Sequence, residues 1–174
     1  MTTVNTVKIP ENVKVQIEGR RVKVTGPKGA VERDMTYPGI SLTCDGKELV
    51  ISTGSSRKQE IAMCGTFASH ARNMCIGVVE GYNYRMKVVY SHFPIQLKVV
   101  GNRLEIANFL GEKKARYANL LSGTKVTVGN DEVTVTGIDK EVVGTTVASI
   151  SHATHIRDRD PRVFQDGIYL VERA

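Results

Sequence analysis

A short lysine-rich segment has the composition of a phosphate-binding loop. Residues 111–116 read G-E-K-K-A-R, a glycine turn followed by three positive charges in close succession. Cationic side chains that converge on a turn can neutralise the phosphates of a nucleic acid backbone. Lys113 and Lys114 are therefore candidate contacts, although a solvated strand end of this composition needs no function.

A second candidate lies where a helix is predicted to begin. Residues 137–140 read G-I-D-K, in which Gly137 permits close approach of a ligand to the backbone. The first amides of a helix and its positive dipole end attract anions. Asp139 opposes this, because its carboxylate would occupy some of those amides and repel phosphate. Gly137 and Lys140 are the candidate contacts of this segment.

The third candidate is rich in arginine. Residues 157–162 read R-D-R-D-P-R, and the forks of Arg157, Arg159 and Arg162 suit bidentate phosphate contacts and stacking on unpaired bases. The two aspartates leave a local charge of only +1. They either orient the arginines through local pairs or make the segment a self-neutralised surface loop, and the residues alone leave both open.

No arrangement typical of an enzyme accompanies these segments. Residues 26–29, G-P-K-G, are too short for a nucleotide-binding loop and predict a turn whose glycines take positive φ, with Lys28 a candidate phosphate contact. No G-x-S-x-G nucleophile motif occurs. His152, His155 and Asp158 could hold a metal, so a small metal-dependent hydrolase stays as an alternative. Because no cysteine is placed to complete such a site, we expect no catalytic residue, metal or cofactor.

Composition favours a polyanionic partner. The 174 residues include 24 Lys+Arg against 18 Asp+Glu, a net charge of +6, and the pI is about 9.3. Residues 1–87 hold most of the excess, with 13 basic and 8 acidic residues. Three cysteines without a C-x-x-C pair indicate a reduced, cytoplasmic setting. No apolar run reaches the roughly 20 residues that cross a membrane, so we expect no membrane partner.

The elements that must position the candidates are duplicated. Residues 13–29 read VKVQIEGRRVKVTGPKG, and 82 positions later residues 95–111 read IQLKVVGNRLEIANFLG, with matching apolar positions and a matching central glycine. This alternation around a glycine turn predicts a hairpin with one buried face. The later segments 49–54 and 132–137 also correspond, and each precedes apolar residues at helical spacing.

Each copy is therefore predicted to be a small antiparallel sheet covered by one main helix. The expected fold class is α+β, with two tandem domains, 1–82 and 83–174. Ser55 or Ser56 and Asp139 are the predicted N-caps of the two helices. Residues 82–93 are expected to be an extended connection, and the tail after His155 shows no helical or alternating period, so we expect it to be irregular.

Several motifs together resemble one known family over essentially the whole chain. They are residues 25–30 (T-G-P-K-G-A), 108–114 (N-F-L-G-E-K-K), 137–144 (G-I-D-K-E-V-V-G) and 157–169 (R-D-R-D-P-R-V-F-Q-D-G-I-Y). The chain resembles the sixth universal protein family of the large ribosomal subunit. The form of the second domain and the tail is similar to the archaeal and eukaryotic branch, and the lack of a long basic extension favours the archaeal side.

The resemblance implies two related domains and a structural role on the large subunit. The second domain and tail would dock on large-subunit ribosomal RNA near the sarcin/ricin loop and the factor-binding stalk base, beside neighbouring ribosomal proteins and where translational GTPases act. Charges of the first domain, at Arg20, Arg21, Lys23 and Lys28, are weaker candidates, because that domain projects more toward the surface. The alternative is an RNA-binding adaptor outside the ribosome. The implied contacts are Lys113, Lys114, Gly137, Lys140, Arg157, Arg159 and Arg162.

Overall fold

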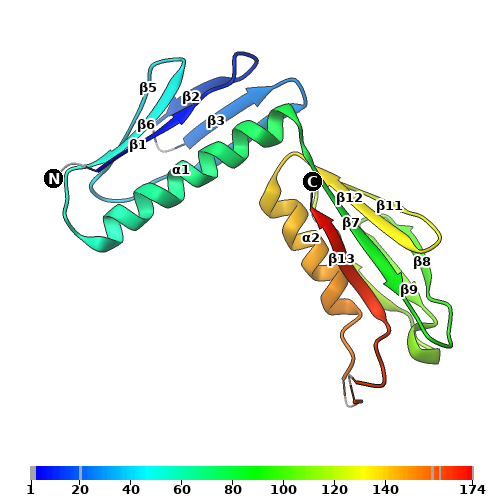
Figure 1. Cartoon of the computed structure of the whole chain (residues 1–174). Coiled ribbons are helices and arrows are strands. Elements are labelled where there is room, and N and C mark those ends of the chain that lie inside the picture. Colours follow the sequence, from blue (N-terminus) through cyan, green and yellow to red (C-terminus); the bar gives the residue numbers. More distant parts are fainter. Residues whose placement is uncertain (1–2, 20, 158, 161, 174) are drawn as a thin grey trace. The chain divides into compact units, whose positions relative to one another are not determined.

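The computed structural model describes residues 3–19, 21–157, 159–160 and 162–173. It divides into two compact units, Met1–Gly81 and Tyr82–Ala174, which Figure 1 draws in blue to green and in green to red. Each unit is built from antiparallel sheets and one α-helix. The predicted α+β class with duplicated domains is confirmed.

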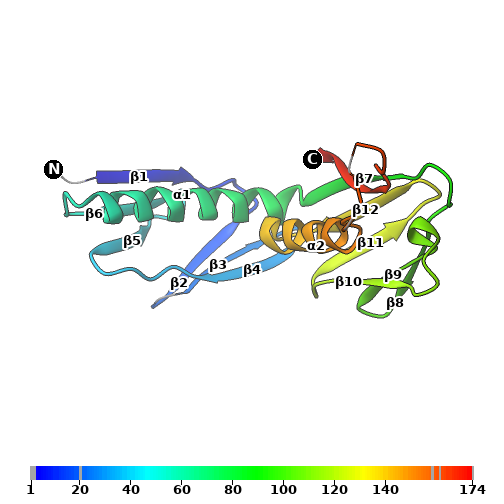
Figure 2. The same cartoon turned by 90° about the horizontal axis from the view of Figure 1, so that it is seen from below.

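The first unit packs its helix against two three-stranded sheets. The sheets have the orders β2-β3-β4 and β1-β6-β5, and the helix contacts strands of both (Figure 2). Alternating apolar residues explain this, since Val22 and Val24 of β3 are fully buried while their neighbours are exposed. Cys64 and Cys75 are buried on the helix as free thiols. The elements are β1 (Thr3–Lys8), β2 (Lys14–Glu18), β3 (Arg21–Gly26), β4 (Gly29–Asp34), β5 (Ile40–Cys44), β6 (Glu48–Thr53) and α1 (Lys58–Val79).

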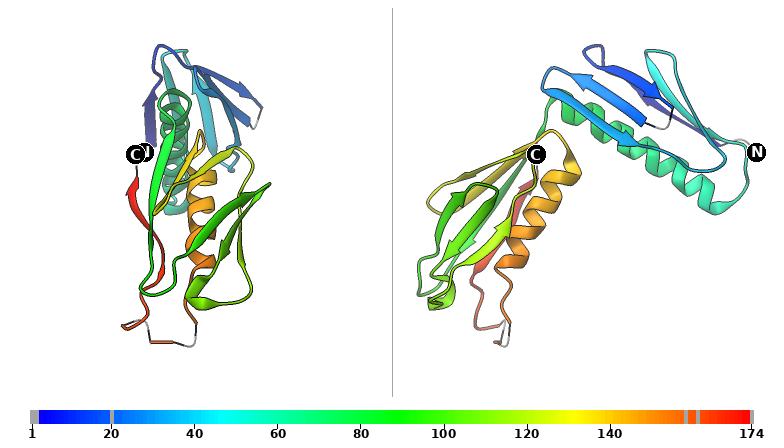
Figure 3. Two further views of the ribbon diagram at one scale, coloured as in Figure 1. Left: turned by 90° about the vertical axis from the view of Figure 1, so that its right-hand side faces the viewer. Right: turned by 180° about the vertical axis from the view of Figure 1, so that it is seen from behind.

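The second unit repeats this plan and adds one strand. Its sheets have the orders β10-β9-β8 and β11-β12-β7-β13, and its helix contacts β7, β10, β11, β12 and β13 (Figure 3). The buried core runs from Tyr84 and Met86 of β7 to Leu104 and Ile106 of β9 and Ile150 of the helix. The elements are β7 (Tyr82–Val89), β8 (Gln96–Val100), β9 (Arg103–Ala107), η1 (Phe109–Gly111), β10 (Arg116–Asn119), β11 (Thr124–Val128), β12 (Glu132–Gly137), α2 (Lys140–Ala153) and β13 (Gly167–Arg173).

The two predicted hairpins are confirmed, including their turns. β2 pairs with β3 and β8 pairs with β9, both antiparallel. The matching turn glycines, Gly19 and Gly101, have φ of 61° and 57°. Glycine is favoured there because a side chain in this left-handed region meets the backbone.

Three local expectations were wrong. The tail is not irregular throughout, because residues 167–173 form β13 beside β7, with a register shift between Leu170 and Glu172. β7 is not a mere connection, because it lies between β12 and β13 inside a sheet. The N-cap of α1 is Arg57, which makes no side-chain cap bond; the Ser55 hydroxyl instead accepts from the Arg57 amide, 3.2 Å away, in the preceding turn.

Residues 26–29 close the end of α1. A Cβ on Gly26 would lie 2.7 Å from Val78 Cγ2 and 2.9 Å from the Val78 carbonyl oxygen, so this glycine is needed for close packing rather than for positive φ, which only Gly29 adopts in this turn (144°). The Lys28 amide donates to the Val78 carbonyl at 3.0 Å, and its ammonium group donates to the Glu80 carbonyl. Lys28 is thus engaged with the helix end.

Substitution of Gly26 by alanine should destabilise the first unit. The added methyl group meets a backbone carbonyl that cannot move cheaply, so we expect a loss of about 1–3 kcal/mol in the free energy of unfolding, as for other overpacked sites. Urea unfolding of the full chain measures it. The matched control is Gly54→Ala, where no atom lies within 4 Å of the new Cβ; equal losses in the two variants would contradict the packing explanation.

Candidate nucleic-acid interface

The seven candidate residues all belong to the second unit but lie at two ends of α2. Lys113 and Lys114 are in the connection between η1 and β10, and the three arginines follow the C-terminal end of α2. Gly137 and Lys140 are at its N-terminal end. A helix of 14 residues is about 21 Å long. The candidates therefore form two groups: the helix-start pair (Gly137 and Lys140) and the lysine–arginine end (Lys113, Lys114, Arg157, Arg159 and Arg162).

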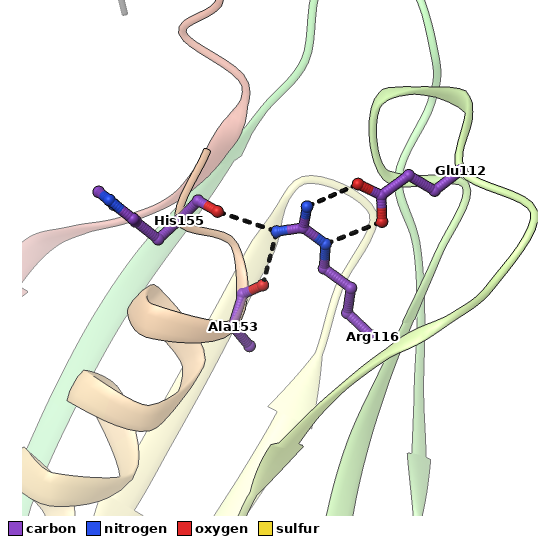
Figure 4. Close-up of polar contacts among 4 residues, drawn as sticks. All are labelled: Glu112, Arg116, Ala153 and His155. Atoms are coloured by element: carbon purple, nitrogen blue, oxygen red, sulfur yellow. Dashed lines mark hydrogen bonds and ion pairs between the residues drawn. The ribbon is translucent and has the colours of Figure 1, made fainter. Parts of the chain in front are cut away.

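Arg116 joins the lysine segment to the end of α2 (Figure 4). Its guanidinium donates to both carboxylate oxygens of Glu112, at 2.9 and 2.6 Å. The same group donates to the backbone carbonyls of Ala153 and His155, at 3.1 and 3.0 Å. The last carbonyls of a helix have no partner within the helix, and a cation there also complements the helix dipole. One side chain thus closes α2 and ties the lysine segment to it.

The turn before the lysines is held in a demanding conformation. Asn108 and Leu110 have φ of 59° and 51°, and Gly111 has φ of 75°. Non-glycine residues in this region cost about 1–3 kcal/mol each unless their surroundings hold them. Two contacts stabilise this conformation. The ring of buried Phe109 packs against the Arg116 guanidinium, which lies 4.4 Å from its centroid, and the side-chain amide of Asn108 donates to the Pro94 carbonyl. Both ends of the lysine segment are anchored.

The arginine segment contains a backbone turn built by Asp160. The Asp160 carboxylate accepts from the Arg162 amide at 2.9 Å, and its carbonyl accepts from the amides of Val163 and Phe164. Arg159 lies over the Phe164 ring, 4.8 Å from its centroid. Among the described residues no ion pair joins Asp160 to an arginine. Asp160 thus shapes the loop rather than neutralising it, while Asp158 lies outside the described residues.

The helix-start pair is largely occupied by the protein itself. Asp139 is the N-cap that the sequence predicted, accepting from the Glu141 amide at 2.9 Å. A Cβ on Gly137 would lie 2.6 Å from Val143 Cγ2, so packing alone accounts for this glycine. Lys140 is exposed, with its ammonium nitrogen 5.9 Å from the centroid of the Tyr82 ring. The carboxylate at the first turn makes this end a poorer anion site than the lysine–arginine end.

The cations of the first unit face carboxylates. Arg21 forms an ion pair with Asp34 at 2.9 Å, and Lys23 pairs in register with Glu32 across β3 and β4. Arg20 lies outside the described residues. The positive excess of residues 1–87 is thus offset locally on this face of the sheet.

The alternative metal site falls partly outside the described residues. His152 and His155 both line one cleft, but among the described residues no group of three or more histidine, cysteine or acidic side chains could hold a metal ion. The third suggested ligand, Asp158, is outside that part of the chain. No described helix is long and apolar enough to cross a membrane.

Removing the Arg116 side chain should loosen the lysine–arginine end. Arg116→Ala leaves two carbonyls and the Glu112 carboxylate without their donor. Such a loss typically costs about 1–3 kcal/mol in unfolding free energy for each buried group. Because this site is partly exposed, we expect a cost at the low end of that range. Urea unfolding checks this, with a substitution at an exposed arginine of the same unit, Arg103→Ala, as control. Hydrogen exchange of the Lys113 and Lys114 amides should rise only in Arg116→Ala.

The Glu112 pair should also make stability depend on pH. The hydrogen bond from Arg116 holds the pKa of Glu112 below its ordinary value, with help from the nearby charge of Arg159. A lowered pKa means that this stabilisation is complete above the unfolded pKa of about 4.3 and is lost as pH falls through the folded value. Glu112→Gln should therefore destabilise the protein at pH 7 but much less at about pH 3. An equal effect at both pH values would contradict the assignment.

Comparison with known proteins accounts for both units. The model of the family ribosomal protein L6 matches residues 9–81 and 93–167. The large ribosomal subunit protein uL6 of Methanospirillum hungatei is 60% identical over 174 residues, covering 100% of this chain and 99% of that protein. Those of Methanocella arvoryzae and Methanosarcina mazei are 51% and 52% identical, over 98% and 97% of this chain and 97% and 96% of theirs. The chain therefore belongs to the ribosomal protein L6 family, in the archaeal branch that its motifs predicted.

Proposed function

We propose that the chain is a structural constituent of the large ribosomal subunit that binds large-subunit ribosomal RNA through its lysine–arginine end. Family membership makes it a ribosomal protein and not an enzyme, which places it in the cytoplasm on the ribosome. Its site would lie near the sarcin/ricin loop and the base of the factor-binding stalk. There it would stabilise the folded RNA beside neighbouring ribosomal proteins, in the region where translational GTPases act.

The observation that carries this proposal is the convergence of two cationic segments on one end of α2. Arg116 holds the lysine segment against the helix terminus from which the arginine segment departs. The side chains of this end are exposed. The Asp160 carboxylate, which lies within the arginine segment, accepts from a backbone amide instead of pairing with an arginine. Cations held on a rigid frame can recognise the spacing of phosphates in a folded RNA.

The helix-start pair would be a secondary contact. Lys140 is exposed about 21 Å away along α2, so it can reach a different part of the RNA backbone. Its contribution should be smaller, because the Asp139 carboxylate accepts from the Glu141 amide in the first turn of the helix and carries negative charge. The first unit, whose charges pair across its strands, would contribute mainly non-specific attraction.

Sedimentation with large subunits tests the proposal. A tagged chain should comigrate with large subunits in sucrose gradients at about 0.1 M salt, and at about 0.5 M five phosphate contacts alone would lose roughly 100- to 1,000-fold in affinity. Retention at the higher salt would show a docked component held by shape as well as by charge. A chain that stays at the top of the gradient in low salt would favour the RNA-binding adaptor outside the ribosome.

A charge-matched pair of variants separates the docked arginines from bulk charge. Arg157→Ala, Arg159→Ala and Arg162→Ala together should weaken association strongly and lower the salt slope by about 2–3. The control removes three exposed cations from the first unit, Lys14→Ala, Arg21→Ala and Lys23→Ala, and should change association little. Equal loss in the two triple variants would mean that net charge and not placement is responsible.

A further inference from the structure

A cleft opens beside the lysine–arginine end, where the chain returns from the arginine segment toward β13. Its volume is about 410 Å³, near the lower end of the roughly 300–1,000 Å³ of small-ligand sites. One wall is the C-terminal end of α2 and the other is the segment 164–169. The residues that line it are Ser151, His152, Thr154, His155, Ile156, Phe164, Gln165, Gly167, Ile168 and Tyr169.

Hydrogen bonds hold the two walls together before any ligand binds. The Ser151 hydroxyl donates to the Ile168 carbonyl at 3.3 Å, and the Ile168 amide donates to the buried Thr154 hydroxyl at 3.2 Å. The Tyr169 hydroxyl donates to the Gln165 carbonyl at 3.1 Å. Its ring lies against Gly167, where a Cβ would be 3.1 Å from the ring. The cleft is therefore a built feature of the fold.

The walls carry aromatic residues, and no acidic residue is among the described residues that line them. His152 and His155 line the cleft from the helix end, and Phe164 and Tyr169 line the opposite wall. Aromatic faces stack on any nucleobase, because every base has a π-face. The Arg159 guanidinium that lies over Phe164 places a phosphate-binding cation at the margin. The aromatic residues of the cleft thus suit the base of a nucleotide, and the cation at its margin suits the phosphate.

We propose that this cleft receives one unstacked nucleobase of the RNA, while Arg157 and Arg159 hold the flanking phosphates. A paired base cannot enter, because it is enclosed in a duplex whose deep groove excludes side chains, so the occupant is a base from a loop, bulge or end. The inference rests on the proposed RNA binding and adds its recognition element. It also gives His152 and His155 a role that needs no metal.

A matched pair of short RNAs tests base insertion directly. One is a pentanucleotide with a single central adenine and four abasic positions, and the other is the same backbone with all five positions abasic. Because a stacked base contributes roughly 5- to 100-fold in affinity, the full chain should bind the first more tightly by a factor in that range. Nuclear magnetic resonance should show base-dependent shifts of the His152 and His155 ring signals.

Variants locate the effect in the cleft. Phe164→Leu and His155→Leu each remove a ring but keep apolar volume; both should bring the ratio of the two affinities toward one. Phe93→Leu makes the same chemical change at a ring outside the cleft and should leave the ratio unchanged. Far-ultraviolet circular dichroism confirms that each variant is folded.

Three results would overturn the proposal. Equal affinity of the wild-type chain for the two RNAs, or failure of the adenine-containing RNA to bind, would show that the cleft accepts no base. A base preference that persists in both Phe164→Leu and His155→Leu would place the base elsewhere. The proposed function fails separately, if the unmodified chain does not comigrate with large subunits.

Discussion

The candidate interface depends on how the C-terminal carbonyls of α2 are satisfied. Arg116 donates to the carbonyls of Ala153 and His155, forms a two-point contact with Glu112 and lies over the ring of Phe109. These partners come from two parts of the chain, residues 109–112 and 153–155. Because a single guanidinium connects them, the lysine segment, the helix terminus and the start of the arginine segment have a common frame.

The first unit meets the same constraint with an equivalent connection. By the internal repeat, residues 26–29 correspond to residues 108–111. In the first unit that connection is a tight turn, and Lys28 reaches the Glu80 carbonyl at the end of α1. In the second unit the connection continues through Glu112 to Arg116 before the next strand begins. In both copies a cation from this connection therefore donates to a carbonyl at the C-terminal end of the helix. The longer connection of the second unit also carries Lys113 and Lys114.

Charge alone would have favoured the first half of the chain as the candidate interface. Residues 1–87 hold most of the positive excess, yet Arg21 pairs with Asp34 and Lys23 stands opposite Glu32. The second half is nearly neutral overall, but its fold gathers cations at one end of a helix and directs the neighbouring Asp160 carboxylate to a backbone amide. Local placement, and not net charge, therefore decides where a polyanion can be held with specificity.

Much of the fold was determined by short-range patterns in the sequence. Alternating apolar residues and the turn glycines Gly19 and Gly101 predicted both hairpins, because each pattern depends only on neighbouring residues. Asp139 was recognisable as an N-cap for the same reason. Four motifs together, at residues 25–30, 108–114, 137–144 and 157–169, also sufficed to identify the family.

Only the tertiary structure decided what joins distant segments. β13 is an edge strand with a register shift, and its pairing with β7 is a long-range contact that leaves no clear period in residues 167–173. The sequence suggested that Gly26 is a turn glycine, but a glycine is needed there because Val78 leaves no room for a Cβ atom. In the sequence Arg116 is one of three neighbouring cations, and only its nearby partner Glu112, four residues earlier, could have been inferred. The carbonyls that it closes lie 37 and 39 positions away in the chain, and sequence periodicity carries no information at that separation.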